Sequence, residues 1–161
     1  QITVITRTRI KKEKFFKKNL LVKNFIQNIK EFDYFVIACD LNETTLNLIT
    51  KKEISLMKNT CVIVNVARGP IVNEKDLYTA LKKNLIGGAI IDTWYKYPES
   101  KSKECFKPSR FNFGKLNNIV MTPHLSAISY NLLERRVKLI SRNITALNEN
   151  KKLINVIHNE K

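Results

Sequence analysis

Three side chains suited to catalysis stand where predicted β-strands end. Arg68, Asp92 and His124 each come shortly after a different run of apolar residues. An arginine fork can hold a carboxylate through two parallel hydrogen bonds, and a histidine can exchange a proton with a carbonyl oxygen near neutral pH. The three residues together therefore suit a substrate that carries both a carboxylate and a carbonyl group.

Each of the three residues also has a purely structural interpretation. A single arginine at a strand end is often a surface ion-pair partner. A Pro123-His124 dipeptide is typical of an ordinary loop, and Asp92 could cap the segment that follows it. The order and spacing of the three residues together are more specific than any one of them alone.

Short apolar runs predict the strands that must position these side chains. The run at 34–38 is continuously apolar, as expected for a strand buried on both faces, and 88–91 predicts a further buried strand. The predicted strands are 2–6, 20–22, 34–38, 61–66, 88–91 and 119–121.

Helix-start signals lie between the predicted strands. Asn24 and Gln27 have the spacing of a capping box, in which two side chains satisfy free amides of the first turn. Thr50 and Glu53 form a second such pair and predict a short helix that ends near Met57.

Two further helices are predicted from their apolar faces. Asn73 is expected to cap a helix that carries Leu77, Ala80 and Leu81 on one face. A last helix is predicted to start near Ser129. We expect its apolar stripe to pack against the body of the protein, through Leu133, Val137, Ile140, Ile144 and Leu147.

Buried strands that alternate with amphipathic helices predict an α/β fold with a parallel sheet. Ligands of such sheets bind at the carboxyl ends of the strands. The segment 92–116 contains Pro98, Pro108 and Gly114 and is too long for a simple connector, so we expect it to be a functional loop.

Composition limits the class of protein. The 161 residues are 43% hydrophobic, as expected for one domain with a core. The net charge of +15 comes from lysines spread along the chain, so we predict no nucleic-acid partner. No apolar run approaches the ~20 residues of a membrane span, and no secretory signal is visible.

Cysteine and histidine usage bears on compartment and metals. Cys39, Cys61 and Cys105 are far apart and share no metal-type spacing, and the histidines are His124 and His158. This pattern predicts a reduced, cytoplasmic protein without a metal site.

From Phe35 to Leu147 the chain resembles the D-isomer-specific 2-hydroxyacid dehydrogenase family. The landmarks that carry the resemblance occur in the order that the family shows. They are residues 53–58, 65–69, 72–81, 87–89, Asp92 and 122–124.

The resemblance implies roles for the matching positions. Arg68 would hold the substrate carboxylate and carbonyl, and His124 would protonate the carbonyl oxygen while nicotinamide delivers a hydride. Asp92 would contact the cofactor near the nicotinamide. The other implied cofactor contacts are Cys39, Val66, Ala67, Leu125, Ser126 and Ala127.

Two positions depart from the family pattern. Tyr97 replaces the glutamate that usually bonds the histidine; its phenol can hydrogen-bond His124 but supplies no charge at neutral pH. Tyr97 is therefore the candidate partner of His124, with Glu99 as an alternative. Asp40 stands where many relatives have a proline beside the nicotinamide.

The residue after the first predicted strand bears on the choice of cofactor. This strand corresponds to the second strand of a dinucleotide-binding sheet. An acidic residue after that strand binds the ribose 2′-hydroxyl of NAD, whereas an arginine favours the 2′-phosphate of NADP. The chain has Arg7 at this position. We therefore predict NAD or NADP as cofactor, with a preference for NADP(H).

The sequence contains no G-x-G-x-x-G loop to cradle the cofactor pyrophosphate. We therefore expect an incomplete, doubly wound, Rossmann-like parallel sheet that lacks the first strand and leaves two inner edges unpaired. Residues 1–150 are predicted to form a partial NAD(P)-binding domain, and 151–161 a tail that returns toward a substrate domain. As a fragment, the chain is expected to be inactive alone.

The resemblance implies hydride transfer between NAD(P)H and a small 2-keto or D-2-hydroxy acid, such as glyoxylate or hydroxypyruvate, in a protein that is a homodimer when complete. The neutral Tyr97 leaves a formate- or phosphite-type dehydrogenase as one alternative. A dinucleotide-regulated, corepressor-like binding protein is another, because some relatives use the dinucleotide in this way.

Overall fold

The computed structural model describes residues 1–11, 13–98 and 106–156. The chain divides into two compact units, Gln1–Leu125 and Ser126–Lys161, and each is described by itself. The predicted domain division at residue 150 stays a prediction. Glu99, and residues 157–161 of the predicted tail, lie outside the described residues.

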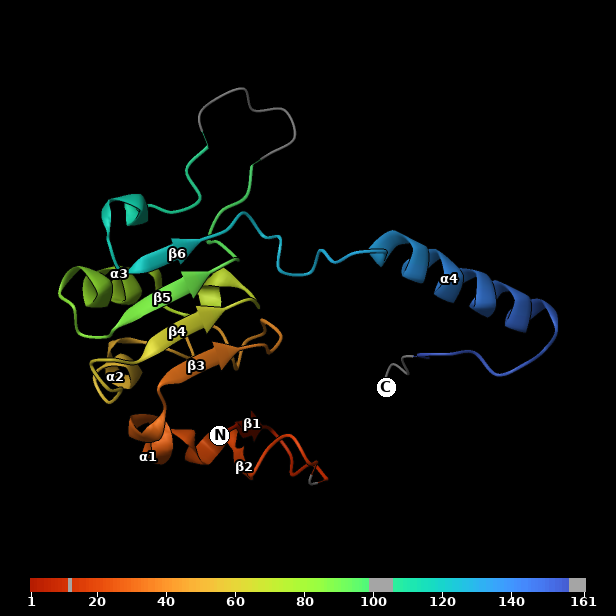
Figure 1. Cartoon of the computed structure of the whole chain (residues 1–161), viewed down its shortest axis with the longest axis horizontal. Helices are drawn as coiled ribbons and strands as arrows, with labels where there is room; N and C mark the ends of the chain where they lie inside the picture. Colours follow the sequence, from red (N-terminus) through yellow and green to blue (C-terminus); the bar gives the residue numbers. More distant parts are fainter. Residues whose placement is uncertain (12, 99–105, 157–161) are drawn as a thin grey trace. The chain divides into compact units, whose positions relative to one another are not determined.

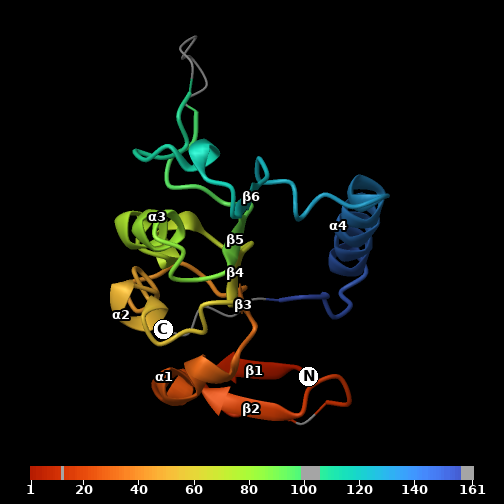
Figure 2. The same ribbon diagram turned by 60° about the vertical axis from the view of Figure 1, so that its left-hand side comes forward.

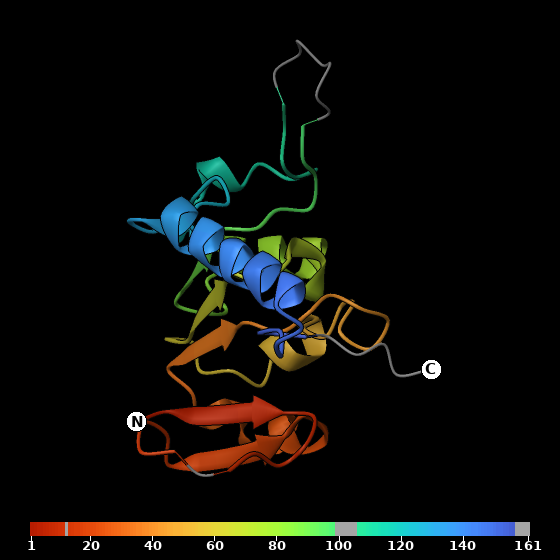
Figure 3. The ribbon, with the colours of Figure 1, turned by 90° about the vertical axis from the view of Figure 1, so that its right-hand side faces the viewer.

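All strands of the first unit run parallel to their neighbours, as predicted (Figure 1). They form a two-stranded sheet in the order β1-β2 and a four-stranded sheet in the order β3-β4-β5-β6. Figure 3 shows β1 and β2 side by side. The strands are β1 (Thr3–Thr6), β2 (Lys18–Leu21), β3 (Tyr34–Ile37), β4 (Val62–Asn65), β5 (Gly88–Ile91) and β6 (Ile119–Met121).

The separation into two sheets agrees with the expected unpaired edges. β1 pairs only with β2, and β3 pairs only with β4, among the strands that the structure describes. Each therefore has one edge whose backbone groups face no neighbouring strand. The arrangement corresponds to a Rossmann-like sheet in which one central strand is not contributed by these residues.

Short helices connect the strands. The α-helices are α1 (Phe25–Asn28), α2 (Lys51–Ile54), α3 (Glu74–Lys82) and α4 (Leu132–Asn148). Single 3-10 turns occur at η1 (Val22–Asn24), η2 (Ile29–Glu31), η3 (Gly69–Ile71) and η4 (Phe113–Lys115).

The predicted cap at Thr50 is confirmed and the one at Asn24 is wrong. The Thr50 side chain accepts from a first-turn amide of α2, and the Glu53 carboxylate accepts from the Thr50 amide, which completes a capping box. Asn24 makes no side-chain cap bond. The reason is that η1 runs directly into α1, so Asn24 is already helical, with ψ near 0° instead of the extended value of a cap.

One face of the four-stranded sheet is buried, and Figure 2 shows α2 and α3 on the same side of it. The α3 side chains Leu77, Ala80 and Leu81 are all buried, and Asn73 caps the helix, as predicted. The strand residues buried on this face are Phe35, Ile37, Ile63, Asn65, Ala89 and Ile91.

The opposite face of the sheet is open, so the prediction of strands buried on both faces is wrong. Tyr34 is 67% exposed and Val36 is 61% exposed, although both belong to a continuous apolar run. Ile90 of β5 and Val120 of β6 are also exposed and pair in register with one another. The physical reason is that the helices connecting these strands cover a single face.

The apolar stripe of α4 is present but exposed. None of the 17 residues of α4, all of which the structure describes, is buried. Val137 is 63% exposed and Ile144 is 64% exposed. The predicted packing of this stripe on the body of the protein would join the two units, and it stays a prediction. The stripe has the period of a buried face, and within the described part of this unit, residues 126–156, α4 is not accompanied by a second helix or strand.

Candidate functional site

The loop after β4 is organised by a buried asparagine. Asn65 is 1% exposed, and its side-chain oxygen accepts the amide of Ala67 at 3.1 Å while its NH2 donates to the carbonyl of Arg68 at 2.9 Å. These bonds fix the turn that carries the arginine. The guanidinium of Arg68 is exposed and donates to the Ala67 carbonyl at 2.6 Å.

The loops after β4 and β5 touch at a glycine. A Cβ atom added to Gly69 would lie 2.5 Å from the carbonyl carbon of Trp94 and 2.9 Å from the amide nitrogen of Tyr95. Such distances are far inside van der Waals contact, so only glycine permits this approach of the two backbones. The close contact ties the position of Arg68 to the loop that follows Asp92.

Asp92 is buried and joins the loops after β5 and β6 through hydrogen bonds. It is 2% exposed, and one carboxylate oxygen accepts both the hydroxyl of Thr122 and the backbone amide of Leu125, the latter at 2.8 Å. Thr122 and Leu125 flank His124 on either side. Asp92 therefore holds the turn that presents the histidine.

His124 has a left-handed backbone with φ of 60°, and its side chain is exposed. Non-glycine residues seldom adopt this conformation, so the surrounding structure must hold it. The ring of Tyr97 lies against the imidazole, with centroids 5.5 Å apart and planes tilted by 48°. The Tyr97 hydroxyl accepts the backbone amide of Trp94 at 3.1 Å.

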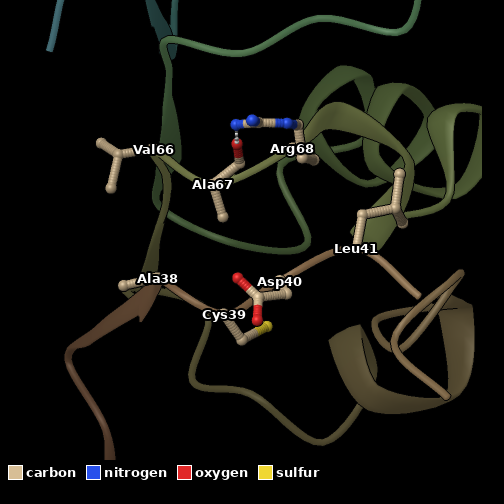
Figure 4. A pocket seen from close by; sticks show the side chains of 7 residues that line it. All are labelled: Ala38, Cys39, Asp40, Leu41, Val66, Ala67 and Arg68. Carbon is tan, nitrogen blue, oxygen red and sulfur yellow. Dashed lines mark hydrogen bonds between the residues drawn. The ribbon is translucent and has the colours of Figure 1, made fainter. Parts of the chain in front are cut away.

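A pocket of about 550 Å³ lies between the loops after β3 and β4 (Figure 4). Figure 4 shows the side chains of Cys39 and Asp40 close together, opposite the segment that carries Ala67 and Arg68. Burial, with a smaller contribution from the Asp40 charge, raises the pKa of the Cys39 thiol. The lining residues are Ala38, Cys39, Asp40, Leu41, Val66, Ala67 and Arg68.

The structure brings some of the predicted site residues together and not others. Cys39, Val66, Ala67 and Arg68 line one pocket. Asp92, Tyr97, His124 and Leu125 form a second group, at the ends of β5 and β6. Arg7 follows β1 in the separate two-stranded sheet, and Ser126 and Ala127 belong to the second unit.

Ser109 and Arg110, which precede β6 in the chain, are anchored by a buried carboxylate. Glu74, the first residue of α3, is 6% exposed and accepts the hydroxyl of Ser109 at 2.9 Å. It also accepts the amide of Arg110 at 2.8 Å and its guanidinium at 2.7 Å. Burial alone would raise the pKa of Glu74, but these bonds and the Arg110 charge outweigh it, so the pKa is lowered.

Sequence reasoning missed Asn65, Glu74 and Trp94 as organising residues. A polar residue at the end of a strand otherwise composed of valine and isoleucine was the available signal for Asn65. No sequence signal marks Glu74, because its partners are 35 and 36 residues away in the chain.

No group of three or more His, Cys, Asp or Glu side chains that could hold a metal ion occurs among the described residues. None of the helices within those residues is long and apolar enough to cross a membrane.

Comparison with known proteins identifies the family. Residues 1–126 match the family described as D-isomer specific 2-hydroxyacid dehydrogenase, NAD binding domain. The glyoxylate reductase of Pyrococcus horikoshii is 33% identical over 146 residues, which cover 91% of this chain and 41% of that enzyme. The glyoxylate reductase of Pyrococcus furiosus is 34% identical over 118 residues, which cover 73% of this chain and 32% of that enzyme. The chain thus spans less than half the length of these relatives.

Solved structures have the same fold. A D-isomer specific 2-hydroxyacid dehydrogenase from Xanthobacter autotrophicus Py2, in complex with NADPH and MES, superposes with a TM-score of 0.79 at 21% identity, over 97% of this chain and 60% of that one. An NADPH-dependent glyoxylate/hydroxypyruvate reductase from Sinorhizobium meliloti, in complex with NADP and sulfate, superposes with a TM-score of 0.79 at 18% identity. The match covers 96% of this chain and 47% of that one. By the extent of the sequence match, the chain belongs to the D-isomer specific 2-hydroxyacid dehydrogenase family, and its residues 1–126 correspond to the family's NAD-binding domain.

Proposed function

We propose that the protein containing this chain reduces a small 2-keto acid to the D-2-hydroxy acid, with NADPH or NADH as the reductant. The observation that carries the proposal is that Arg68 and His124 follow β4 and β6, parallel strands with only β5 between them. Neighbouring strands lie ~4.8 Å apart, so the two loops start roughly 10 Å apart at one edge of the sheet. A small keto acid fits between two side chains at that spacing.

Arg68 would bind the substrate carboxylate. A guanidinium has five N–H donors in a planar fork, and the bond to the Ala67 carbonyl uses one of them. The remaining donors can hold a carboxylate in a bidentate pair. This interaction would fix the carbonyl group in one orientation relative to the edge of the sheet.

His124 would move the proton. In the reducing direction the protonated imidazole gives its proton to the carbonyl oxygen while a hydride reaches the carbonyl carbon, and the reverse reaction returns both. A bound nicotinamide dinucleotide supplies or accepts that hydride. Tyr97, whose ring lies against the imidazole, would restrict the directions in which His124 can turn.

The described residues fit one part of a dinucleotide. The pocket lined by Cys39, Val66 and Ala67 lies at the carboxyl edge of the sheet, where such cofactors bind. Asp92, Leu125, Ser126 and Ala127 are the further contacts that we propose toward the nicotinamide end. The sequence has no G-x-G-x-x-G loop, so these residues account for only part of the cofactor site.

A preference for NADPH is part of the proposal. Arg7 is exposed directly after β1, and the hydrogen bond from Thr6 to the Thr8 carbonyl spans it. We expect Arg7→Ala to weaken NADPH binding about tenfold and to spare NADH, since a 2′-phosphate contact is lost. Arg9→Ala serves as the matched control. Equal affinity of the unmodified protein for NADPH and NADH would contradict the preference.

Steady-state kinetics test the reaction itself. In the complete protein, Arg68→Lys should raise the KM for glyoxylate or hydroxypyruvate, because lysine cannot form the bidentate pair. His124→Gln should lower kcat by roughly 10²–10⁴-fold. Arg135→Lys, an exposed change on α4, is the control. Keto-acid reduction that persists unchanged in both site variants would refute the assignment.

The same assay addresses the alternatives. A formate- or phosphite-type dehydrogenase would reduce the cofactor with those substrates and leave glyoxylate unchanged, and a corepressor-like protein would bind dinucleotide without turnover. The homodimer and the cytoplasmic location stay predictions, the first of which light scattering of the complete protein tests.

A further inference from the structure

The turn that carries His124 is held by hydrogen bonds to residues outside the turn. Residues Thr122 to Leu125 form a bend, with Pro123 and His124 at its two central positions. In an ordinary β-turn, the amide of the fourth residue bonds to the carbonyl of the first. Here the Leu125 amide donates to Asp92 at 2.8 Å, and the Thr122 carbonyl accepts the indole N–H of Trp94 at 2.9 Å.

The central residues explain why outside support is needed. Proline suits the first central position, but a positive φ at the second favours glycine or asparagine. His124 occupies that position with φ of 60°. A positive φ is uncommon for a residue other than glycine, and the two bonds from the loop after β5 support the turn in this conformation.

Trp94 contacts residues next to both Arg68 and His124. Its indole N–H holds the His124 turn, and its backbone amide donates to the Tyr97 hydroxyl, whose ring lies against the imidazole. Its own carbonyl carbon lies against Gly69, the residue after Arg68. Trp94 is 7% exposed and packs edge-on against Phe113, with ring centroids 5.9 Å apart.

We infer that Trp94 and Asp92 are positioning residues that set the direction of the His124 imidazole and its spacing from Arg68. The inference rests on the proposed keto-acid reduction, and it adds a specific donor, the indole N–H, which a phenylalanine ring at this place would lack. Asp92 supports one end of the turn and Trp94 the other.

Hydrogen exchange measured by mass spectrometry tests the geometry without cofactor or substrate. Trp94→Phe keeps the ring and removes only the donor. We expect it to speed exchange in peptides that contain Leu125 by about three- to tenfold, the effect of one lost hydrogen bond, with β4 peptides unchanged. Thr122→Val, which removes the hydroxyl bond to Asp92, should act in the same way.

Tyr95→Phe is the matched control. It deletes one hydrogen bond of the same loop, from the Tyr95 hydroxyl to the Val72 carbonyl at 3.0 Å, that does not reach the His124 turn. We expect it to leave exchange at Leu125 unchanged. Equal exchange in Trp94→Phe, Tyr95→Phe and the unmodified protein would overturn the inference, as would acceleration spread evenly over β4 and the turn.

Kinetics separate positioning from a general structural role. In the complete protein, Trp94→Phe should lower kcat about ten- to a hundredfold through misplacement of the imidazole, while the KM set by Arg68 stays within about twofold. A rise in KM with unchanged kcat would contradict the inference. If glyoxylate and hydroxypyruvate are not reduced at all, the proposed function fails, but the exchange result still decides whether Trp94 holds the turn.

Discussion

Glu74 offers the most stringent test of how the loop between β5 and β6 is held. Its buried carboxylate is bonded to Ser109 and to two groups of Arg110. Replacement by alanine leaves the Ser109 hydroxyl and the Arg110 amide without this acceptor. Each such loss costs ~1–3 kcal/mol in a buried place. The ion pair adds little, because the Arg110 side chain is 70% exposed. We expect Glu74→Ala to lose about 2–6 kcal/mol of unfolding free energy.

The effect of Glu74 has a defined pH dependence. Its folded-state pKa lies below the ordinary value of 4.5, so its contribution to stability is present above about pH 4.5 and is lost as pH falls through the folded pKa. The difference in unfolding free energy between the unmodified chain and Glu74→Gln that depends on the Glu74 charge should therefore become smaller in acid. Glutamine keeps one acceptor oxygen, so this variant should lose about 1–2 kcal/mol at neutral pH.

Urea unfolding followed by tryptophan fluorescence measures both variants. Trp94, the single tryptophan of the chain, lies in the same loop and packs on Phe113. Glu134→Gln is the control, because that glutamate forms an exposed i,i+4 pair with Lys138 and should change stability by less than ~0.5 kcal/mol. A Glu74→Ala variant as stable as the control at pH 7, or a Glu74→Gln deficit that grows in acid, would refute the reasoning.

Three further predictions concern other parts of the chain. Gly69→Ala should destabilise the chain by about 1–3 kcal/mol, measured by urea unfolding, because its Cβ would meet the Trp94 backbone at 2.5 Å. Burial raises the pKa of the Tyr95 hydroxyl. The stability that the protonated hydroxyl contributes is therefore present below about pH 10 and is lost as the pH rises further. When unfolding is measured over a pH series, Tyr95→Phe should lose less unfolding free energy in alkali than the unmodified chain. Mass spectrometry after alkylation should find Cys39 modified in the folded chain and Cys61, which is fully buried, only after unfolding.

The strand positions and the order of the site residues could be predicted from sequence. Apolar runs bounded by polar residues mark each of the six strands to within about two residues. Because parallel strands end at one edge, the order of Arg68, Asp92 and His124 along the chain was enough to expect them in one region. The Thr50 capping box was equally local, since both partners lie in one turn of helix.

The tertiary structure alone decided which faces are covered and what holds the catalytic loops. Val36 and Ile90 have the sequence pattern of buried residues, yet both are exposed, because burial depends on a second element that periodicity cannot reveal. The support of His124 by Trp94 joins the loops after β5 and β6, through contacts 28 residues apart that no local pattern encodes. Sequence determined which groups reach the edge of the sheet, and long-range hydrogen bonds decided how they point.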